Sequence, residues 1–179
     1  MHFNNFLPTV STQGSPHYYS LSLADELATQ RLGAYLSTHI KPGFNLYLQG
    51  DLGTGKTTLT RAILRSLGVK GTLRSPSYAL LEPYEIACLE QHHPNTGALL
   101  HHFDFYRLDQ QPLAWKEAGF ASAFETPHAT VVEWPEYAEG LPRPTILIAL
   151  QHRGDCRVAN IESYIDLNTY LTLTQYNPF

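Results

Sequence analysis

The chain has 179 residues, of which 43% are hydrophobic and 16% charged, so a single globular domain with a substantial core is expected. The formal net charge of −4 excludes an overall basic surface for nucleic acid, although an RNA reached through partner proteins is compatible with it. Two cysteines without CxxC spacing argue against a disulfide framework. No apolar run reaches the ~20 residues of a membrane span, and residues 1–20 do not resemble a signal peptide, so a cytoplasmic location is expected.

The N-terminal residues 1–21 are polar and interrupted by proline and glycine, which predicts a flexible lead-in to one domain over residues 22–179. Ser22, with Asp25 three residues later, predicts the start of a helix. Apolar residues at helical spacing extend this helix to about His39.

A glycine-rich segment with the spacing of a phosphate-binding loop (P-loop) follows a short predicted strand at residues 44–49. Residues 50–57 read Gly-Asp-Leu-Gly-Thr-Gly-Lys-Thr, and apolar side chains at helical spacing follow up to Leu67. The glycines allow the backbone N–H groups to surround phosphate oxygens, Lys56 supplies positive charge, and the Thr57 hydroxyl can bind Mg²⁺. The strand–loop–helix order supports a nucleotide site. Its expected binding residues are Asp51, Leu52, Gly53, Thr54, Gly55, Lys56, Thr57 and Thr58.

Beyond the loop, short apolar or β-branched runs indicate further strands. They lie at residues 78–81, 99–105, 129–134 and 145–150, with weaker candidates at 157–161 and 164–173. Residues 85–97 break the pattern and predict an exposed loop. This order of helices and strands favours an α/β fold, a three-layer P-loop NTPase-like domain with a mixed central sheet.

Two acidic residues stand where they can complete a nucleotide site. Asp104 lies at the end of the predicted strand 99–105, where a carboxylate can hold a metal ion. Glu133 ends a buried run before Pro135, and a carboxylate there is costly unless it is paired or bound to metal. Glu133 can orient the attacking water, act as a base or bind the metal; the sequence leaves these roles open. Trp134 is expected to serve in packing.

Residues 74–78 follow the P-loop helix and contain hydroxyl groups on a proline-bent segment. They fit either a switch that senses the γ-phosphate or a plain turn before a strand. The adjacent pairs at residues 92–93 and 101–102 are histidines, but neighbouring side chains on a strand point to opposite faces, so no structural metal site is expected.

Four segments, in this order and at these separations, resemble the TsaE (YjeE) family. They are residues 50–58, 75–78, 102–108 and 133–136, and the resemblance extends over residues 22–151. It implies an ATPase that supports threonylcarbamoyladenosine formation in tRNA, acts with TsaB and TsaD, and reaches tRNA only through that complex. The expected cofactors are ATP and Mg²⁺, and the expected turnover is slow until partner proteins bind.

The resemblance also implies residue roles. It assigns catalysis to Lys56 and Glu133, and metal binding to Thr57, Asp104 and Glu133. Two positions depart from the family pattern: Ser77 stands in place of threonine, and Thr54 in place of alanine. The first departure keeps a hydroxyl, and the second lies in a loop that binds through backbone groups, so neither alters the expected chemistry.

Three other functions use the same loop. A small-molecule kinase needs a basic lid, whereas the arginines here are scattered along the chain. A nucleotide-gated binding module with negligible turnover would share every feature except hydrolysis. A GTPase is disfavoured because the chain has no Asn-Lys-x-Asp guanine-reading element.

Overall fold

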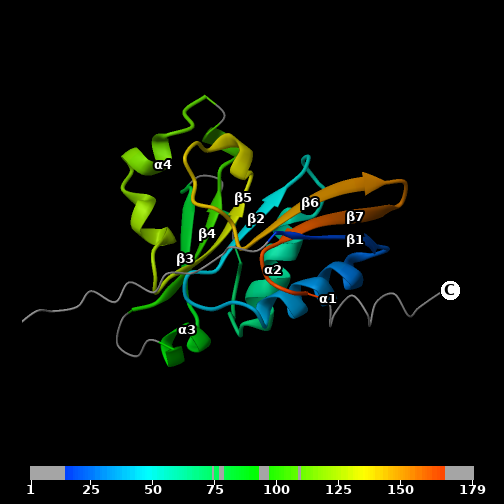
Figure 1. Cartoon of the computed structure of the whole chain (residues 1–179), viewed down its shortest axis with the longest axis horizontal. Coiled ribbons are helices and arrows are strands. Elements are labelled where there is room, and N and C mark those ends of the chain that lie inside the picture. The colour runs from blue at the N-terminus through cyan, green and yellow to red at the C-terminus, as the bar shows by residue number, and fades with distance from the viewer. Residues whose placement is uncertain (1–14, 74, 77–78, 93–96, 109, 168–179) are drawn as a thin grey trace, which may run out of the picture.

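The computed structural model describes residues 15–73, 75–76, 79–92, 97–108 and 110–167. These residues form a seven-stranded sheet in the order β1-β7-β6-β2-β5-β4-β3 (Figure 1). The strands are β1 (His17–Leu23), β2 (Asn45–Gln49), β3 (Leu81–Glu85), β4 (Leu99–Asp104), β5 (Ala129–Glu133), β6 (Ile146–Arg153) and β7 (Cys156–Ser163). The helices are α1 (Glu26–Ser37), α2 (Lys56–Ser66), α3 (Ala87–His92) and α4 (Ala114–Glu117), with 3₁₀ turns η1 (Tyr106–Leu108), η2 (Phe120–Phe124) and η3 (Pro135–Tyr137).

The sheet is mixed, as expected. Strands β6, β2, β5 and β4 run parallel, whereas β3 and β7 pair antiparallel with β4 and β6. Residues 46–48 of β2 are buried, which explains their continuous apolar character, because helices or loops cover both faces of a parallel sheet. Pro83, which cannot donate a ladder hydrogen bond, lies in the edge strand β3.

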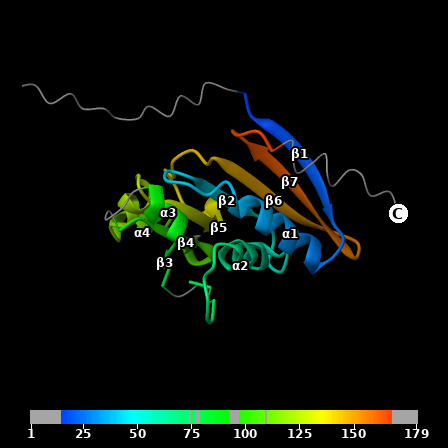
Figure 2. The same cartoon turned by 90° about the horizontal axis from the view of Figure 1, so that it is seen from below.

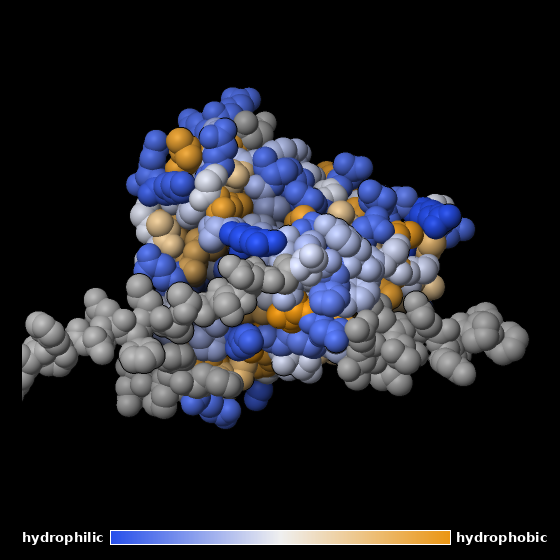
Figure 3. All heavy atoms as spheres, viewed as in Figure 1, coloured by the Kyte–Doolittle hydropathy of each residue, from blue (hydrophilic) through white to orange (hydrophobic). Residues whose placement is uncertain are grey.

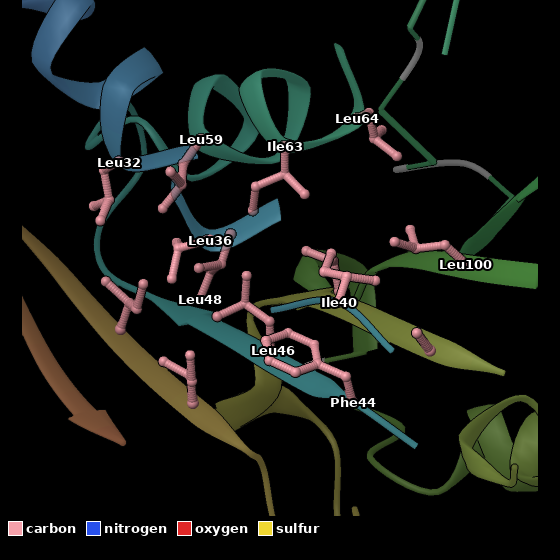
Figure 4. Packing of buried hydrophobic residues seen from close by; sticks show 14 of the residues in the cluster. Leu32, Leu36, Ile40, Phe44, Leu46, Leu48, Leu59, Ile63, Leu64 and Leu100 are labelled. Atoms are coloured by element: carbon pink, nitrogen blue, oxygen red, sulfur yellow. The ribbon is translucent and has the colours of Figure 1, made fainter. Parts of the chain in front are cut away.

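Helices α1 and α2 lie side by side on one face of the sheet (Figure 2). Their contact is close at Gly33, where an added Cβ would lie 2.5 Å from the Cβ of Ala62. Figure 4 shows the leucine and isoleucine side chains of both helices meeting those of β2 between the layers. The labelled members on these elements are Leu32, Leu36, Leu59, Ile63, Leu46 and Leu48. This core fixes the start of α2, and therefore the P-loop, against the end of β2.

A second, aromatic cluster covers the opposite face. Tyr47 and Val132 belong to it, whereas their strand neighbours Leu46 and Val131 belong to the first core, as the alternation of side chains along a strand requires. Trp115 of α4 and Phe103 of β4 are fully buried in this cluster. The three layers are therefore two helices, the sheet, and the short helical segments α4 and η2 with their aromatic side chains.

The structure corrects the predicted start of the domain. Residues 17–21, expected in the lead-in, belong to β1, which pairs antiparallel with β7. Ser22 lies within this strand, and α1 begins instead at Glu26, where the Asp25 side chain accepts a 2.7 Å hydrogen bond from the Ala28 N–H. The physical reason is period-two burial, since alternate β1 residues face the core and the true N-cap stands three residues later than predicted.

Three further predictions need revision. Residues 85–97, predicted as a loop, contain α3, because Ile86 and Leu89 are buried and anchor this turn of helix. Of the strand predicted at 78–81, residue 78 lies outside the described part, and β3 begins at Leu81, since Leu80 has a positive φ of 64°. Residues 164–167 leave the sheet after β7, and residues 168–173 of the same predicted strand lie outside the described part. The strands predicted at 99–105, 129–134, 145–150 and 157–161 are confirmed.

Hydrophilic residues cover most of the face viewed in Figure 3, with small hydrophobic patches between them. Among the described residues, no helix combines the length and the apolar character that crossing a membrane requires.

Candidate nucleotide-binding site

The P-loop connects β2 to α2 in a conformation that needs glycine. Gly50 has φ +131°, and an added Cβ would lie 2.2 Å from the Leu150 carbonyl oxygen of β6. Gly55 caps α2 in the left-handed region, at φ +104°. No side chain caps this helix, so its first N–H groups remain available to an anion such as a phosphate.

A pocket of about 240 Å³ opens above this loop. Its lining joins the loop to the ends of β4 and β5: Leu52, Gly53, Gly55, Lys56, Thr57, Thr58, Ser75, Asp104, Tyr106, Glu133 and Trp134. Asp51 and Thr54, which were expected to bind nucleotide, do not line this pocket. Thr54 is buried, and its hydroxyl donates to the Asp51 carbonyl oxygen at 2.9 Å, so both residues support the shape of the loop.

Lys56 is folded back against its own loop. Its Nζ donates to the carbonyl oxygens of Gly50 at 2.5 Å and Asp51 at 2.9 Å, and lies 3.5 Å from the centre of the Trp134 ring. Burial lowers the pKa of Lys56, and the charge of nearby acids, Glu133 foremost, opposes that shift. Backbone carbonyl oxygens thus hold the Lys56 ammonium in this structure. Phosphate oxygens would be stronger acceptors for it, because they are charged.

Glu133, the last residue of β5, is buried and surrounded by hydrogen-bond donors. Thr57 donates to its Oε2 at 2.7 Å, Thr60 donates to its Oε1 at 3.1 Å, and His102 Nε2 lies 2.9 Å from Oε1. A buried carboxylate is tolerated when its oxygens are paired in this way. The three partners come from α2 and β4, so the packing of the P-loop helix on the sheet sets the position of Glu133.

Asp104 ends β4 directly beside Glu133 in the parallel ladder. Ser75 donates to its Oδ2 at 2.6 Å, and the Tyr106 N–H donates to its Oδ1 at 3.2 Å. The structure therefore brings Thr57, Asp104 and Glu133 to one pocket, as expected for a metal-assisted nucleotide site. Hydroxyl and carboxylate oxygens are suitable ligands for Mg²⁺, so the donor set fits that ion.

Two residues beside the acidic strand ends have a backbone conformation in the left-handed region. Trp134 has φ +59°, and Leu80, whose carbonyl oxygen accepts from the Asp104 N–H at 3.2 Å, has φ +64°. Such conformations are uncommon in residues other than glycine and concentrate at functional sites. Trp134 is packed as expected, with Tyr137 stacked on its ring at 5.4 Å, and it also lines the pocket.

Sequence reasoning missed two partners of Glu133. Thr60 follows Thr57 by three residues, a spacing that places both on one face of a helix and was a usable signal. His102 precedes Asp104 by two residues, so both share a face of β4. Within the segment 74–78, only Ser75 and Pro76 lie in the described part of the chain, and Ser75 reaches Asp104.

Of the two histidine pairs, only the one at residues 101–102 lies in the described part of the chain with its side chains, and its two members have separate partners. His101 Nδ1 lies 3.3 Å from the Ala123 carbonyl oxygen, and His102 contacts Glu133. Over the described residues, no group of three or more His, Cys, Asp or Glu side chains is placed to hold a metal ion.

Comparison with known proteins identifies the family. The family model described as "Threonylcarbamoyl adenosine biosynthesis protein TsaE" matches residues 23–159. The Haemophilus influenzae protein named tRNA threonylcarbamoyladenosine biosynthesis protein TsaE is 36% identical over 152 residues, covering 82% of this chain and 89% of that protein. Its Bacillus subtilis namesake is 30% identical over 129 residues, covering 71% and 73%.

A solved structure, described as Bacillus subtilus YdiB, has the same fold, with a TM-score of 0.64 and 23% identity over 91% of this chain and 95% of that one. The P-loop and the two acidic strand ends indicate the same class of protein as the family model does. The chain belongs to the TsaE family, a family of P-loop ATPases in tRNA threonylcarbamoyladenosine biosynthesis.

Proposed function

We propose that this protein binds ATP with Mg²⁺ on its P-loop and hydrolyses it in support of threonylcarbamoyladenosine formation, together with TsaB and TsaD. One observation carries the proposal. The hydroxyl of Thr57 and the carboxylates of Asp104 and Glu133 converge in the pocket that the P-loop and Lys56 form. A site that only binds a nucleotide needs no more than the loop. Two acids beside the threonine of the loop are what phosphoryl transfer to water requires in addition.

Nucleotide binding uses the loop backbone and Lys56. The free N–H groups at the start of α2 donate to the β-phosphate, and the Lys56 ammonium moves from the Gly50 and Asp51 carbonyl oxygens to the β- and γ-phosphates. This exchange replaces neutral acceptors with charged ones. The buried position of Lys56 favours it further, because a desolvated ammonium gains more from a charged partner.

Thr57 and Asp104 would hold Mg²⁺, which would neutralise the negative charge that develops during phosphoryl transfer. Glu133 is placed beside them and orients the attacking water or accepts its proton. Thr60 and His102 hold the Glu133 carboxylate in place before the reaction, so that the carboxylate need not move when the water attacks. Ser75 fixes Asp104 in the same way from the segment after the P-loop helix.

The partner proteins complete the function. The net charge of −4 gives this chain no general attraction for RNA, so tRNA is reached through the complex rather than bound directly. The transfer of the threonylcarbamoyl group belongs to TsaD, and the nucleotide cycle of this chain supports repeated rounds of it. Hydrolysis is slow alone and faster with partners, and the reaction takes place in the cytoplasm.

Steady-state ATP hydrolysis tests the proposal. The purified chain is assayed alone and with TsaB and TsaD, with Mg²⁺ present or chelated, and Lys56→Ala serves as the inactive control. We expect stimulation by the partners that requires Mg²⁺ and disappears in the variant. Partners that are competent in tRNA modification but leave hydrolysis unchanged would contradict activation. Transfer of labelled phosphate from ATP to a small molecule would favour a kinase.

A further inference from the structure

A cationic side chain approaches the P-loop from the side away from the acids. Strand β6 continues from Ala149, the partner of Gln49 at the end of β2, to Arg153, and it returns as β7 in a long hairpin (Figure 1). His152 and Arg157 are directly paired across this hairpin, so their side chains share one face. That face is turned towards the P-loop.

Two glycines of the loop record how close these side chains come. A Cβ added at Gly55 would lie 3.5 Å from both Cδ and Nε of Arg157. One added at Gly53 would lie 4.0 Å from Nε2 of His152. The hairpin therefore flanks the loop at the residues whose N–H groups are expected to bind phosphate.

Arg157 has a hydrogen-bonding capacity that the described residues do not use. Its Nε is buried without a hydrogen-bond partner, and no described residue forms an ion pair with the guanidinium. Arginine remains charged at any physiological pH, and a buried donor without a partner is unfavourable and uncommon in native proteins. A ligand that carries acceptors beside Gly55 would satisfy it.

The order of the strands indicates which part of a bound nucleotide would lie beside Arg157. Asp104 and Glu133 end β4 and β5 on one side of β2, whereas Arg157 lies on β7, on the other side. When the γ-phosphate and Mg²⁺ lie at the acids, the nucleoside end of the ligand extends away from them. The direction away from the acids along the sheet is that of β6 and β7.

We propose that Arg157 contacts the nucleoside end of the bound nucleotide. This assignment rests on the proposed nucleotide site and adds to it a binding residue outside the P-loop. The planar guanidinium can donate to oxygen or nitrogen acceptors of the nucleoside and stack on its base. Inorganic pyrophosphate matches the two phosphates of ADP but lacks the sugar and base, so Arg157 distinguishes a nucleotide from its phosphates alone.

Affinities for ADP and for inorganic pyrophosphate, measured by calorimetry and competition at fixed Mg²⁺, test the proposal. We expect Arg157→Gln to lower the affinity for ADP by about tenfold, which corresponds to the loss of one charge-assisted contact. The affinity for pyrophosphate should change by less than about twofold. Arg153→Gln is the matched control, since Arg153 is exposed, lies on the same hairpin and faces the opposite side from His152. It should bind both ligands as the parent does.

Each alternative outcome has one meaning. Unchanged ADP affinity in folded Arg157→Gln would overturn the proposal. Equal losses for ADP and pyrophosphate would also overturn it, because Arg157 would then support the loop rather than contact the nucleoside end. If Arg157→Gln does not fold, Arg157→Lys, which keeps the charge and most of the stem, decides by the same two ratios. A parent chain that binds neither ligand would instead overturn the proposed nucleotide site itself.

Discussion

At the scale of single residues, the position of Glu133 depends on three partners that belong to other elements. Thr57 occupies one carboxylate oxygen, and Thr60 and His102 share the other. The positions of Glu133 and Asp104 at the ends of buried strands could be predicted from sequence, because a carboxylate after a buried run is costly unless it is paired or bound. The partners were harder to predict, since helical spacing shows that Thr60 shares a face with Thr57 but not which strand that face meets.

Thr60→Val tests whether these partners serve the reaction. The variant keeps the shape of the side chain and removes one donor to Oε1. A hydrogen bond to a charged group contributes about 1.5 kcal/mol, so partner-stimulated kcat should fall by about tenfold while the KM for ATP changes little. Thr72→Val, at an exposed position, is the control. A rise in KM with unchanged kcat would mean that Thr60 serves binding instead.

At the scale of elements, the closeness of α1 and α2 sets where the P-loop helix starts. The two helices meet at Gly33 and Ala62 without room for another methyl group. Sequence periodicity predicted both helices and the strand between them, because their apolar faces are regular. It missed β1 and α3, since β1 is an edge strand with only one buried face, and α3 is too short to show a period.

Gly33→Ala should destabilise the protein by about 1–2 kcal/mol, because the clash with Ala62 exceeds the gain in helix propensity. Thermal unfolding would show this as a fall in Tm of about 2–8 °C. The effect of Gly33→Ala should shrink or reverse in an Ala62→Gly background, where the obstructing methyl group is absent. The same loss in both backgrounds would show that helix contact is not its cause.

At the scale of the whole molecule, the sheet order places the P-loop between two arms. The acids lie on β4 and β5 on one side, and the β6–β7 hairpin lies on the other. The fold class could be predicted from the P-loop and the alternation of elements. The strand order could not, because β2 pairs with β5 and β6, which lie far along the chain and carry no local sign of their partner.

Ligand binding should stabilise the whole domain through this arrangement. ADP with Mg²⁺ at about 100 times its Kd contributes about 2.7 kcal/mol, which corresponds to a rise in Tm of about 5–10 °C for a chain of this size. Differential scanning calorimetry would measure the shift. Lys56→Ala should show little of it, and an equal shift in that variant would mean that the nucleotide binds away from the P-loop.

We propose that one pocket both binds ATP and hydrolyses it, and that Glu133 is needed for the hydrolysis. The most direct test measures ATP affinity and partner-stimulated hydrolysis on the same preparation of Glu133→Gln. The variant keeps the size of the side chain and removes its charge and basicity. We predict hydrolysis reduced by at least about 100-fold, with ATP affinity within a few-fold of the parent, as for loss of a residue acting in the transition state. Hydrolysis equal to that of the parent would contradict the account.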